Sequence, residues 1–440
     1  MDTPYSLPAE RLEVRLPDAK PKYTSAEARA EAERCLYCHD APCIEKCPTE
    51  INIPEFIHKI ASGNTLGAAR TILAQNILGY TCARVCPVEV LCVGACVYNE
   101  WHKTPIAIGR LQRYATESLL EHEALTGQAV LRPKTPTEGR RKVALVGAGP
   151  ASLACAAYLA LEGHEAVIYE RGALPGGLNT TGVAPYKLHS EDSLREVAYV
   201  QSLGVTLKTG VEVGRDLSAS SLLNDHDAVF LGMGLGADAR LSIADEAGPG
   251  VWGATALIEK IKNDASFKLP AVKRATVVGG GNTAIDIARE LAQLGVAEVV
   301  MVYRRGAEHM SGYKHEMDLA RKEGIRLVGW RQPVAVLRDA AGGVSGLRLR
   351  DTQQGGEETL STELVVLAIG QEKIKGLTDA FGGIALDQKG CVVADAKTRQ
   401  TSNPKVYAGG DCINGGKEVV NAVADGRDAA RAMIQRWFAA

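Results

Sequence analysis

A strand–turn–helix–strand unit near residue 150 most constrains how this chain can fold. Residues 143–146 are all apolar, as in a buried parallel strand. A turn of small residues, 147–152, leads into an apolar, alanine-rich helix that Gly163 can end, and a second short strand, 166–169, stops at Glu170. This order of elements predicts a βαβ unit of a doubly wound α/β fold, with a ligand at the turn.

The same turn has the chemistry of a dinucleotide site. Gly147 permits a tight turn, Gly149 lets the backbone approach a pyrophosphate, and the small Ser152 lets the helix pack closely on the strand. The start of the helix offers free N–H groups to that pyrophosphate, and Glu170 can accept hydrogen bonds from a ribose. A purely structural glycine turn is the alternative, but the strand, helix and acid in this order favour dinucleotide binding.

A second unit of the same kind follows later in the chain. It consists of a strand over 275–278, a glycine turn over 279–284, a helix over 284–294 and a strand over 298–303. Two such units predict two nucleotide domains with two different ligands. A last helix is expected from about 418 to 438.

Eight of the 11 cysteines fall in one segment and have the spacing of metal ligands. The first group follows C-x2-C-x4-C-x3-C-P and the second C-x3-C-P-x4-C-x3-C; they are Cys35, Cys38, Cys43 and Cys47, then Cys82, Cys86, Cys92 and Cys96. Thiolates are the soft ligands of iron–sulfur clusters, and a proline after a remote cysteine is typical of two-cluster ferredoxins. Two structural zinc sites are the alternative, but they favour paired C-x2-C hooks, which the second group lacks. The other three, Cys155, Cys391 and Cys412, are expected to be packing residues.

The region before the first nucleotide unit has no convincing strand and is predicted to be helical. After an extended arm over residues 1 to about 24, a helix starts near residue 24. Further helices are expected over 53–61, 65–75 and 106–123, with Asn64 as an N-cap. A charged, proline-containing linker, 132–141, precedes the first unit.

Composition excludes several classes of protein. The formal net charge of −2 disfavours binding to nucleic acid or to an anionic membrane. No apolar run reaches the roughly 18 residues of a membrane helix, and the N-terminus lacks a signal-peptide core. We therefore expect a cytoplasmic protein, in which disulfides are disfavoured and clustered cysteines are better explained by metal binding.

Several motifs resemble those of a known family. The stretches CLYCHDAPCIEKCP, LGYTCARVCPVEVLCVGAC and IGRLQRYATE resemble the N-terminal iron–sulfur domain of dihydropyrimidine dehydrogenase. VGAGPAS, PGGL, GGGNTA, YRR and AGGD resemble its FAD and NAD(P)H domains. The resemblance runs from about Ala26 to the end and stops where the FMN barrel would start, as in the NAD(P)H-oxidising subunit of the bacterial enzymes. The glutamate synthase small subunit shares this architecture.

The resemblance implies a specific set of cluster ligands. One [4Fe-4S] cluster is expected on Cys35, Cys38, Cys43 and Cys96, and the other on Cys47, Cys86, Cys92 and the side-chain oxygen of Gln112. Cys82 then binds neither cluster, although composition alone would make it the eighth ligand. A glutamine on a helix is otherwise usually solvated. In glutamate synthase small subunits an acid is typical at this position, which favours the dehydrogenase.

The resemblance also assigns the two nucleotides. FAD is expected at Gly147, Gly149, Pro150, Ala151, Ser152, Glu170, Gly176, Gly177, Leu178, Lys187, Val213, Gly410, Asp411, Val419 and Val420. NAD(P)H is expected at Gly279, Gly281, Asn282, Thr283, Ala284, Arg304, Arg305, Ala368 and Gly370. The N–H groups of Val419 and Val420, at a helix start, can point at the flavin pyrimidine edge. Lys187 stands where relatives often have arginine.

The second unit favours NADPH over NADH. No acid follows its second strand, and Arg304 and Arg305 stand there instead. A carboxylate would repel a 2′-phosphate, whereas arginines accept it. The alternative is that both arginines are merely exposed on a surface turn.

The resemblance implies two Rossmann-like domains, one inserted in the other, after an α-helical iron–sulfur domain. Residues 1–135 would hold the clusters, 136–239 with 371–440 FAD, and 240–370 NAD(P)H. A hydride from NAD(P)H would reach the flavin without an acid or base from the chain, and single electrons would pass through the clusters to a partner. That partner, an FMN- and iron–sulfur-containing barrel subunit in a hetero-oligomer, would reduce uracil or thymine. A glutamate synthase small subunit, a related NADPH–ferredoxin-type oxidoreductase, or a non-catalytic scaffold are the alternatives.

Overall fold

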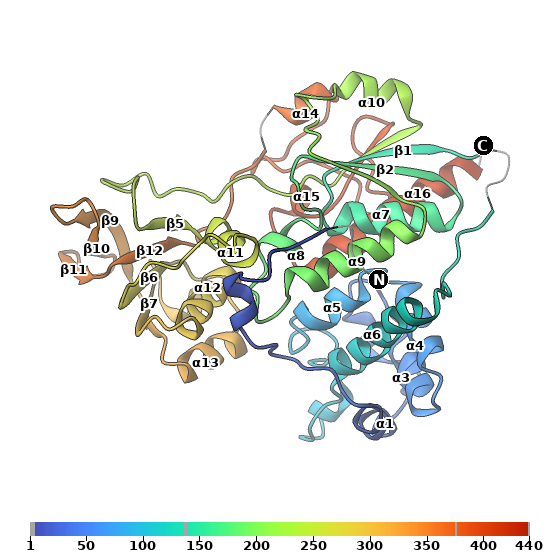
Figure 1. Cartoon of the computed structure of the whole chain (residues 1–440), viewed down its shortest axis with the longest axis horizontal. Helices are drawn as coiled ribbons and strands as arrows, with labels where there is room; N and C mark the ends of the chain where they lie inside the picture. Colours follow the sequence, from blue (N-terminus) through green and yellow to red (C-terminus); the bar gives the residue numbers. More distant parts are fainter. Residues whose placement is uncertain (1–4, 136–138, 375, 439–440) are drawn as a thin grey trace.

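The structure is a computed structural model that describes residues 5–135, 139–374 and 376–438. Figure 1 shows three regions: a helical region from the first part of the chain and two separate parallel sheets with their helices. Residues 1–4 of the predicted arm and 136–138 of the predicted linker lie outside the described residues.

The helical region forms where capping residues and apolar stripes predict helices. Its helices are α1 (Ser25–Glu33), α2 (Pro42–Glu45), α3 (Ile53–Ala61), α4 (Thr65–Leu73), α5 (Gly79–Val85) and α6 (Ile108–Thr126), with short 3-10 helices η1 (Leu12–Arg15) and η2 (Val97–Asn99). Thr24 and Glu27 form a capping box at α1, and the Asn64 side chain caps α4. The predicted helices are confirmed, and residues 5–135 contain no strand.

The first sheet is parallel throughout, in the order β13-β4-β1-β2-β3. Its strands are β1 (Lys142–Val146), β2 (Glu165–Glu170), β3 (Thr206–Thr209), β4 (Ala228–Leu231) and β13 (Val406–Ala408). Its helices are α7 (Pro150–Leu161), α8 (Leu178–Thr181), α9 (Ser190–Ser202), α10 (Ala219–Asp225), α14 (Leu377–Ala380), α15 (Asp411–Asn414) and α16 (Val419–Phe438). The predicted unit is β1-α7-β2, and the last predicted helix is α16.

The second sheet is also parallel, in the order β5-β12-β6-β7-β8. Its strands are β5 (Val251–Gly253), β6 (Arg274–Val278), β7 (Glu298–Val302), β8 (Arg326–Val328) and β12 (Leu364–Leu367). Helices α11 (Ala254–Asn263), α12 (Asn282–Gln293) and α13 (Lys314–Lys322) pack on one face, and η3 (Ala307–His309) follows β7. Because β13 joins the first sheet only after β12, the second sheet is inserted within the first region.

A small antiparallel sheet that the sequence analysis did not foresee covers the other face of the second sheet. It contains β9 (Arg331–Arg338), β10 (Val344–Asp351) and β11 (Glu357–Ser361). Apolar side chains such as Val336 and Leu347 pack against Val300 and Val365 of the parallel sheet. The alternation of apolar and polar residues along β10 is the signal that could have predicted it.

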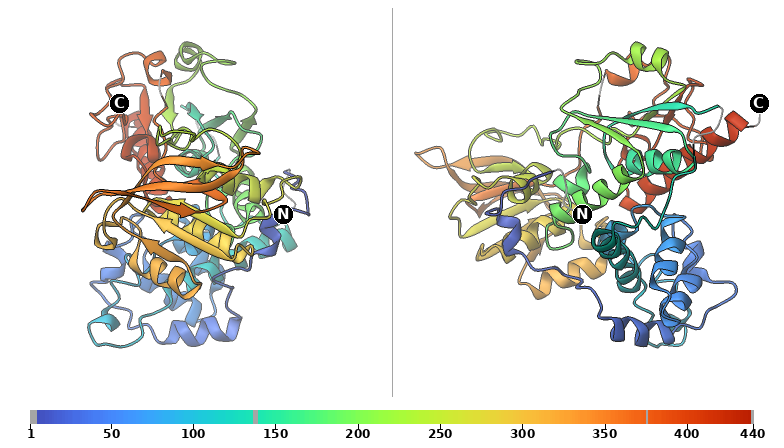
Figure 2. Two further views of the ribbon diagram at one scale, coloured as in Figure 1. Left: turned by 90° about the vertical axis from the view of Figure 1, so that its left-hand side faces the viewer. Right: turned by 45° about the vertical axis from the view of Figure 1, so that its right-hand side comes forward.

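The helical region and the first sheet share one hydrophobic core. Ile57 and Leu111 of the helical region belong to the same buried cluster as Leu145 and Phe230 of the first sheet, with α7 and α16 between them. The right-hand view of Figure 2 shows the helical region beneath the helices of this sheet. Burial of shared apolar surface therefore fixes these two regions to each other.

The N-terminal arm ties all three regions together. In η1 the buried carboxylate of Glu13 accepts a hydrogen bond from the N–H of Ser190, 2.8 Å, and lies 3.8 Å from the ammonium of Lys262 in α11. Further along, Asp18 pairs with Arg84 of α5 and Arg113 of α6. The arm therefore contacts both sheets and the helical region.

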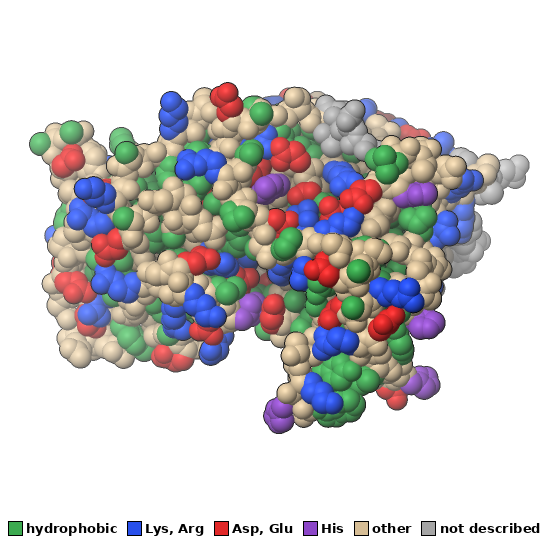
Figure 3. Space-filling view, turned by 60° about the horizontal axis from the view of Figure 1, so that its bottom comes forward, with side chains coloured by type: hydrophobic (Ala, Val, Ile, Leu, Met, Phe, Trp, Pro, Cys, Tyr) green, Lys and Arg blue, Asp and Glu red, His purple; other side chains and the backbone are tan. Residues whose placement is uncertain are grey.

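The surface carries charges of both signs. Figure 3 shows basic, acidic and hydrophobic side chains interspersed over one face, as the near-neutral net charge predicts. Among the helices of residues 5–135, 139–374 and 376–438, none is both long and apolar enough to cross a membrane.

Candidate functional site

One cavity of about 1900 Å³ joins the two glycine turns. Most predicted FAD residues line it: Gly147, Gly149, Pro150, Ala151, Glu170, Gly177, Leu178, Lys187, Val213, Gly410, Asp411 and Val419. So do most predicted NAD(P)H residues: Gly279, Gly281, Asn282, Thr283, Arg304, Arg305, Ala368 and Gly370. Ser152, Gly176, Val420 and Ala284 lie behind this lining rather than in it. The carboxyl ends of both sheets thus open into one space, large enough for two nucleotides.

The first turn has the shape that a pyrophosphate needs. Gly147 has a φ of +87°, and a Cβ there would lie 2.8 Å from the carbonyl oxygen of Gly232. Glu170, at the end of β2, accepts hydrogen bonds from the N–H groups of Ala148 and Gly172, both at 2.7 Å. The carboxylate therefore orders the turn and keeps lone pairs for a ribose at the cavity wall. The buried Ser152 fits against β4, as its small size predicts.

The start of α16 forms the cavity wall opposite the first glycine turn. The first N–H groups of a helix have no partner within it, so those of Val419 and Val420 are available to an electron-rich ligand. Nearby, Asp411 lines the cavity, and burial raises the pKa of its carboxyl. The N–H donors suit the phosphate and pyrimidine groups of a flavin, and the Asp411 carboxylate suits the ribityl hydroxyls, from which it can accept hydrogen bonds.

The second turn repeats the arrangement. Gly279 has a φ of +151°, and a Cβ there would lie 2.2 Å from the carbonyl oxygen of Ala368. Arg304 and Arg305 are exposed at the cavity edge, and a guanidinium nitrogen of Arg305 lies 2.6 Å from the hydroxyl of Tyr303. Within the described part of the chain, neither arginine pairs with a carboxylate, so both guanidinium groups are available to an anion.

The first set of cysteine thiols forms one neighbourhood. Burial, together with the neighbouring thiols of Cys35 and Cys96, raises the pKa of Cys43 to about 12. Cys38 interacts with the same group. Cys96 therefore belongs in space with the first set of cysteines, although in sequence it is the last of the second.

The second set lies around the end of α5. Burial, with the thiols of Cys86 and Cys47 as neighbours, raises the pKa of Cys92. A hydrogen bond with Cys82 and burial raise the pKa of Cys86. Among the described residues, no three His, Cys, Asp or Glu side chains converge closely enough to hold a single metal ion.

Gln112 packs against the start of the helix that leads to Cys86. Its side chain is buried on α6, and its amide nitrogen donates to the carbonyl oxygen of Gly79, 2.7 Å away at the start of α5. No described residue donates a hydrogen bond to its side-chain oxygen. This arrangement orients the amide and leaves the oxygen available as a ligand.

Lys187 contacts the inserted region. Its ammonium lies 2.7 Å from Asp286 of α12 and 2.8 Å from Glu316 of α13. Burial alone would lower the pKa of Lys187, but these two carboxylates raise it above its usual value. A second contact joins the same two regions: the hydroxyl of Tyr313 donates a hydrogen bond, 2.8 Å, to the carboxylate of Glu418, just before α16. Both contacts lie at the cavity and hold the two glycine turns in one relative orientation.

Sequence reasoning missed the polar groups that join the three regions. Lys262 is fully buried on α11 and donates to the carbonyl oxygens of Asn179, Val183 and Leu188 at 2.8–3.2 Å. Glu196 of α9 accepts hydrogen bonds from backbone N–H groups of α5. Neither residue belongs to a motif, and a buried charge cannot be recognised before its partners are known.

Two family models match the chain. The model described as dihydropyrimidine dehydrogenase domain II, 4Fe-4S cluster, matches residues 13–124. The model described as pyridine nucleotide-disulphide oxidoreductase matches residues 141–426. The predicted order of domain types, iron–sulfur and then nucleotide-binding, is confirmed.

Two curated relatives match over nearly their whole length. The glutamate synthase [NADPH] small chain of Escherichia coli K12 is 33% identical, over 94% of this chain and 92% of its own. The NAD-dependent dihydropyrimidine dehydrogenase subunit PreT of the same organism is 34% identical, over 95% and 96%. The expected resemblance is confirmed. Because the two sequence identities are nearly equal, they do not show which of the two relatives this chain resembles more in function.

Among solved structures, thioredoxin reductase of T. acidophilum has the same nucleotide-binding fold. The TM-score is 0.57, and the match covers 68% of this chain and 99% of that one, at 21% identity. This likeness confirms two Rossmann-like domains, one inserted in the other.

Proposed function

Because this chain belongs to the pyridine nucleotide-disulphide oxidoreductase family, in the group that contains the glutamate synthase small chain and PreT, we propose that it is the electron-input subunit of a dihydropyrimidine dehydrogenase. It is an NAD(P)H-dependent flavin and iron–sulfur oxidoreductase. What we propose beyond this is that a partner subunit uses its electrons to reduce pyrimidines.

The single observation that carries the proposal is the continuity of the cavity. Its lining includes both glycine turns and also Val85, Pro87 and Leu91, which flank Cys86 and Cys92. Bound FAD would take a hydride from NAD(P)H and release its electrons singly to iron–sulfur clusters. The chain's own part is to hold both nucleotides at one cavity, fix their orientation through Lys187 and Tyr313, and place the cysteine loop at its wall.

The cluster assignment follows the grouping of the thiols. We assign one [4Fe-4S] cluster to Cys35, Cys38, Cys43 and Cys96, and the other to Cys47, Cys86, Cys92 and Gln112. Burial and neighbouring thiols make it costly for these cysteines to ionise without a cation nearby. A positively charged metal centre favours the ionised form, because it takes the place of the thiol protons. Pairing of Cys96 with Cys43, and of Cys92 with Cys47, supports this assignment over a division into four and four along the sequence.

The proposed partner is an FMN- and iron–sulfur-containing barrel subunit. Next to the first set of cysteines, the side chains of Leu36 and Trp101 are 44% and 53% exposed, and Tyr37 is also exposed. Large apolar side chains exposed together are typical of docking surfaces. Their position beside a proposed cluster supports electron exit to a partner at this face.

The test uses two candidate partners. Anaerobically purified protein with bound FAD and iron is mixed with NADPH or NADH and either a pyrimidine-reducing barrel subunit or a glutamine-dependent glutamate synthase large subunit. We expect oxidation of the nicotinamide coupled to loss of uracil or thymine with the first partner. Coupling to glutamate formation with the second would assign the chain to glutamate synthase, and an iron-free, colourless preparation would favour a non-catalytic scaffold.

Gln112 offers a sharper test of the second cluster. Gln112→Ala removes the ligand oxygen and the bond to Gly79, so we expect a changed spectrum or weaker retention of one cluster with FAD still bound. Loss of a hydrogen-bond partner of a ligand typically weakens metal binding roughly 10- to 100-fold, and loss of a ligand itself should weaken it at least as much. Electron paramagnetic resonance and iron analysis would measure it, and an unchanged spectrum with unchanged iron would remove Gln112 from the ligands.

A further inference from the structure

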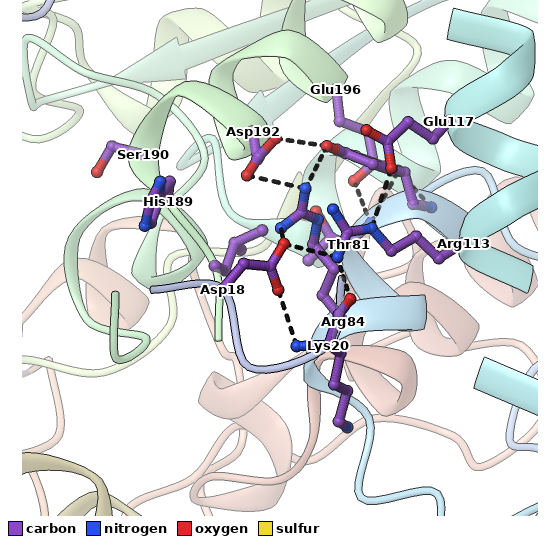
Figure 4. A network of polar contacts seen from close by, with 12 residues as sticks. Asp18, Lys20, Thr81, Arg84, Arg113, Glu117, His189, Ser190, Asp192 and Glu196 are labelled. Atoms are coloured by element: carbon purple, nitrogen blue, oxygen red, sulfur yellow. Dashed lines mark hydrogen bonds and ion pairs between the residues drawn. The ribbon is translucent and has the colours of Figure 1, made fainter. Parts of the chain in front are cut away.

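Glu196 is a buried carboxylate at the boundary between the first sheet and the helical region. It lies on α9, and its side chain accepts hydrogen bonds from the N–H of Tyr80, 2.9 Å, and of Thr81, 3.2 Å. These N–H groups are at the start of α5, so Glu196 caps a helix of another region. Figure 4 shows it beside the polar network around Arg84 and Asp18.

Helix α5 connects this carboxylate to a proposed cluster ligand. It runs from Gly79 to Val85, and Cys86 follows directly as its C-cap. Residues 79–84 of this helix are all buried. At 1.5 Å per residue, the carboxylate and the thiol of Cys86 are separated by roughly 10 Å of protein interior, where solvent and salt screen charges little.

The cations near Cys86 are already engaged by other acids. Arg84 pairs with Asp192 and Asp18, both at 3.1 Å, and Arg113 pairs with Asp18 and Glu117. Lys20 lies 3.4 Å from the carbonyl oxygen of Cys86. Burial would raise the pKa of Asp18, but the N–H of Lys20 and the two guanidinium groups hold it below its usual value. Asp18 therefore stays ionised.

Glu196 differs because it forms no ion pair with any cation in the described part of the chain. Burial raises its pKa to about 7, although hydrogen bonds from Thr81 and Tyr80 and the charge of Arg84 lower it. Among the described residues, the titratable and charged groups that face this site are Tyr80 and Arg84 on α5, Asp192, Arg195 and Tyr199 on α9, Glu117 and Glu123 on α6, and Tyr158 on α7. The Tyr199 hydroxyl is buried without a described partner, so it can hydrogen-bond to a water near this site.

We propose that protonation of Glu196 is coupled to reduction of the iron–sulfur cluster on Cys86: the carboxylate binds its proton more tightly when the cluster holds the added electron, and releases it more readily when that electron leaves. This inference rests on the proposed function, because it requires a cluster at Cys86. The proton passes between solvent and a carboxylate oxygen of Glu196, so that proton uptake partly compensates the charge of the added electron. Glu196 does not touch the cluster. It acts on the cluster through the electrostatic interaction between the two charges, which lie at opposite ends of α5.

The expected strength of the coupling between proton and electron follows from the distance between the Glu196 carboxylate and Cys86. At roughly 10 Å and an effective dielectric constant of about 20, one added negative charge raises the proton affinity of the carboxylate roughly tenfold. Linkage requires an equal effect of the proton on the electron affinity of the cluster. For a one-electron couple that tenfold change is about 59 mV. The midpoint potential should fall as pH rises through the titration of Glu196 and level off on both sides.

The test is a redox titration of the holoprotein, followed by electron paramagnetic resonance, from mildly acidic to mildly alkaline pH. Glu196→Gln keeps the hydrogen-bond acceptor but cannot ionise, so its midpoint should be independent of pH and match the low-pH value of the wild type. Glu290→Gln is the matched control. Glu290 is also fully buried, and burial raises its pKa, but it lies on α12 of the inserted region, and its variant should keep the wild-type profile.

Infrared difference spectra of the wild type keep the proposal testable if the glutamine variant does not assemble. Reduction should produce the carbonyl band of a protonated carboxylic acid, shifted in D2O. A pH-independent wild-type midpoint, absence of that band, or a pH dependence retained by Glu196→Gln would each overturn the proposal. A pH dependence lost equally in both variants would overturn its assignment to Glu196. A holoprotein without the second cluster would overturn the proposed function itself.

Discussion

Cys86→Ser should abolish one cluster and most electron transfer to the partner, whereas Cys82→Ser should retain both clusters. The two thiols lie one turn apart on and after α5 and are hydrogen-bonded to each other. Cys86 also lies beside Cys92, which in turn neighbours Cys47. Serine at position 86 replaces a soft thiolate with a hard oxygen, which binds iron–sulfur clusters poorly. With two [4Fe-4S] clusters expected, the iron content should fall by about half.

The matched control is informative because Cys82 is buried deeper than Cys86. Cys82→Ser can still hydrogen-bond to Cys86, and we expect only packing losses, roughly 1 kcal/mol of unfolding free energy. Iron analysis, cluster spectra and electron transfer to the partner separate the two variants, whereas reduction of ferricyanide, which accepts electrons from the flavin directly, should be unchanged in both. Equal iron loss in both would restore Cys82 as the eighth ligand.

The motifs predicted the fold well because the glycine turns and apolar strands are local signals. The β1-α7-β2 unit and its repeat lie where the sequence places them. The antiparallel sheet over β9–β11 was missed, because its strands are partly exposed and their pairing depends on the parallel sheet beneath them. The positions of helices in the iron–sulfur region followed from their capping residues, such as Thr24 and Asn64.

The site was predictable only where residue type and spacing carry the chemistry. Nearly all predicted nucleotide residues line one cavity, since the ends of parallel strands meet at one edge of a sheet. The polar contacts between regions could not be predicted. The contact of Lys187 with Asp286, and the capping of α5 by Glu196, depend on segments that are distant in sequence and meet only in the folded chain.

The choice between NADPH and NADH is expected to depend on Arg304 and Arg305. Both are exposed at the cavity edge without a carboxylate partner in the described ranges, and no acid stands at the end of β7 to bind a ribose diol. PreT is named as NAD-dependent and the glutamate synthase small chain as NADPH-dependent, so the relatives do not decide the matter. The arginines favour NADPH, because a guanidinium forms charge-assisted hydrogen bonds to a 2′-phosphate.

Loss of one such contact should raise the Michaelis constant for NADPH roughly 10- to 150-fold, because a bond to a charged group is worth about 1.5–3 kcal/mol, and the double variant Arg304→Ala with Arg305→Ala should raise it at least as much. NADH has no 2′-phosphate, so its constant should change little and the two cofactors should converge. Steady-state kinetics with ferricyanide measures this without the partner, and flavin reduction by dithionite should be unaffected. A wild type that already prefers NADH, or a double variant that loses both cofactors equally, would show that the arginines do not bind a 2′-phosphate, and NADH would become the expected donor.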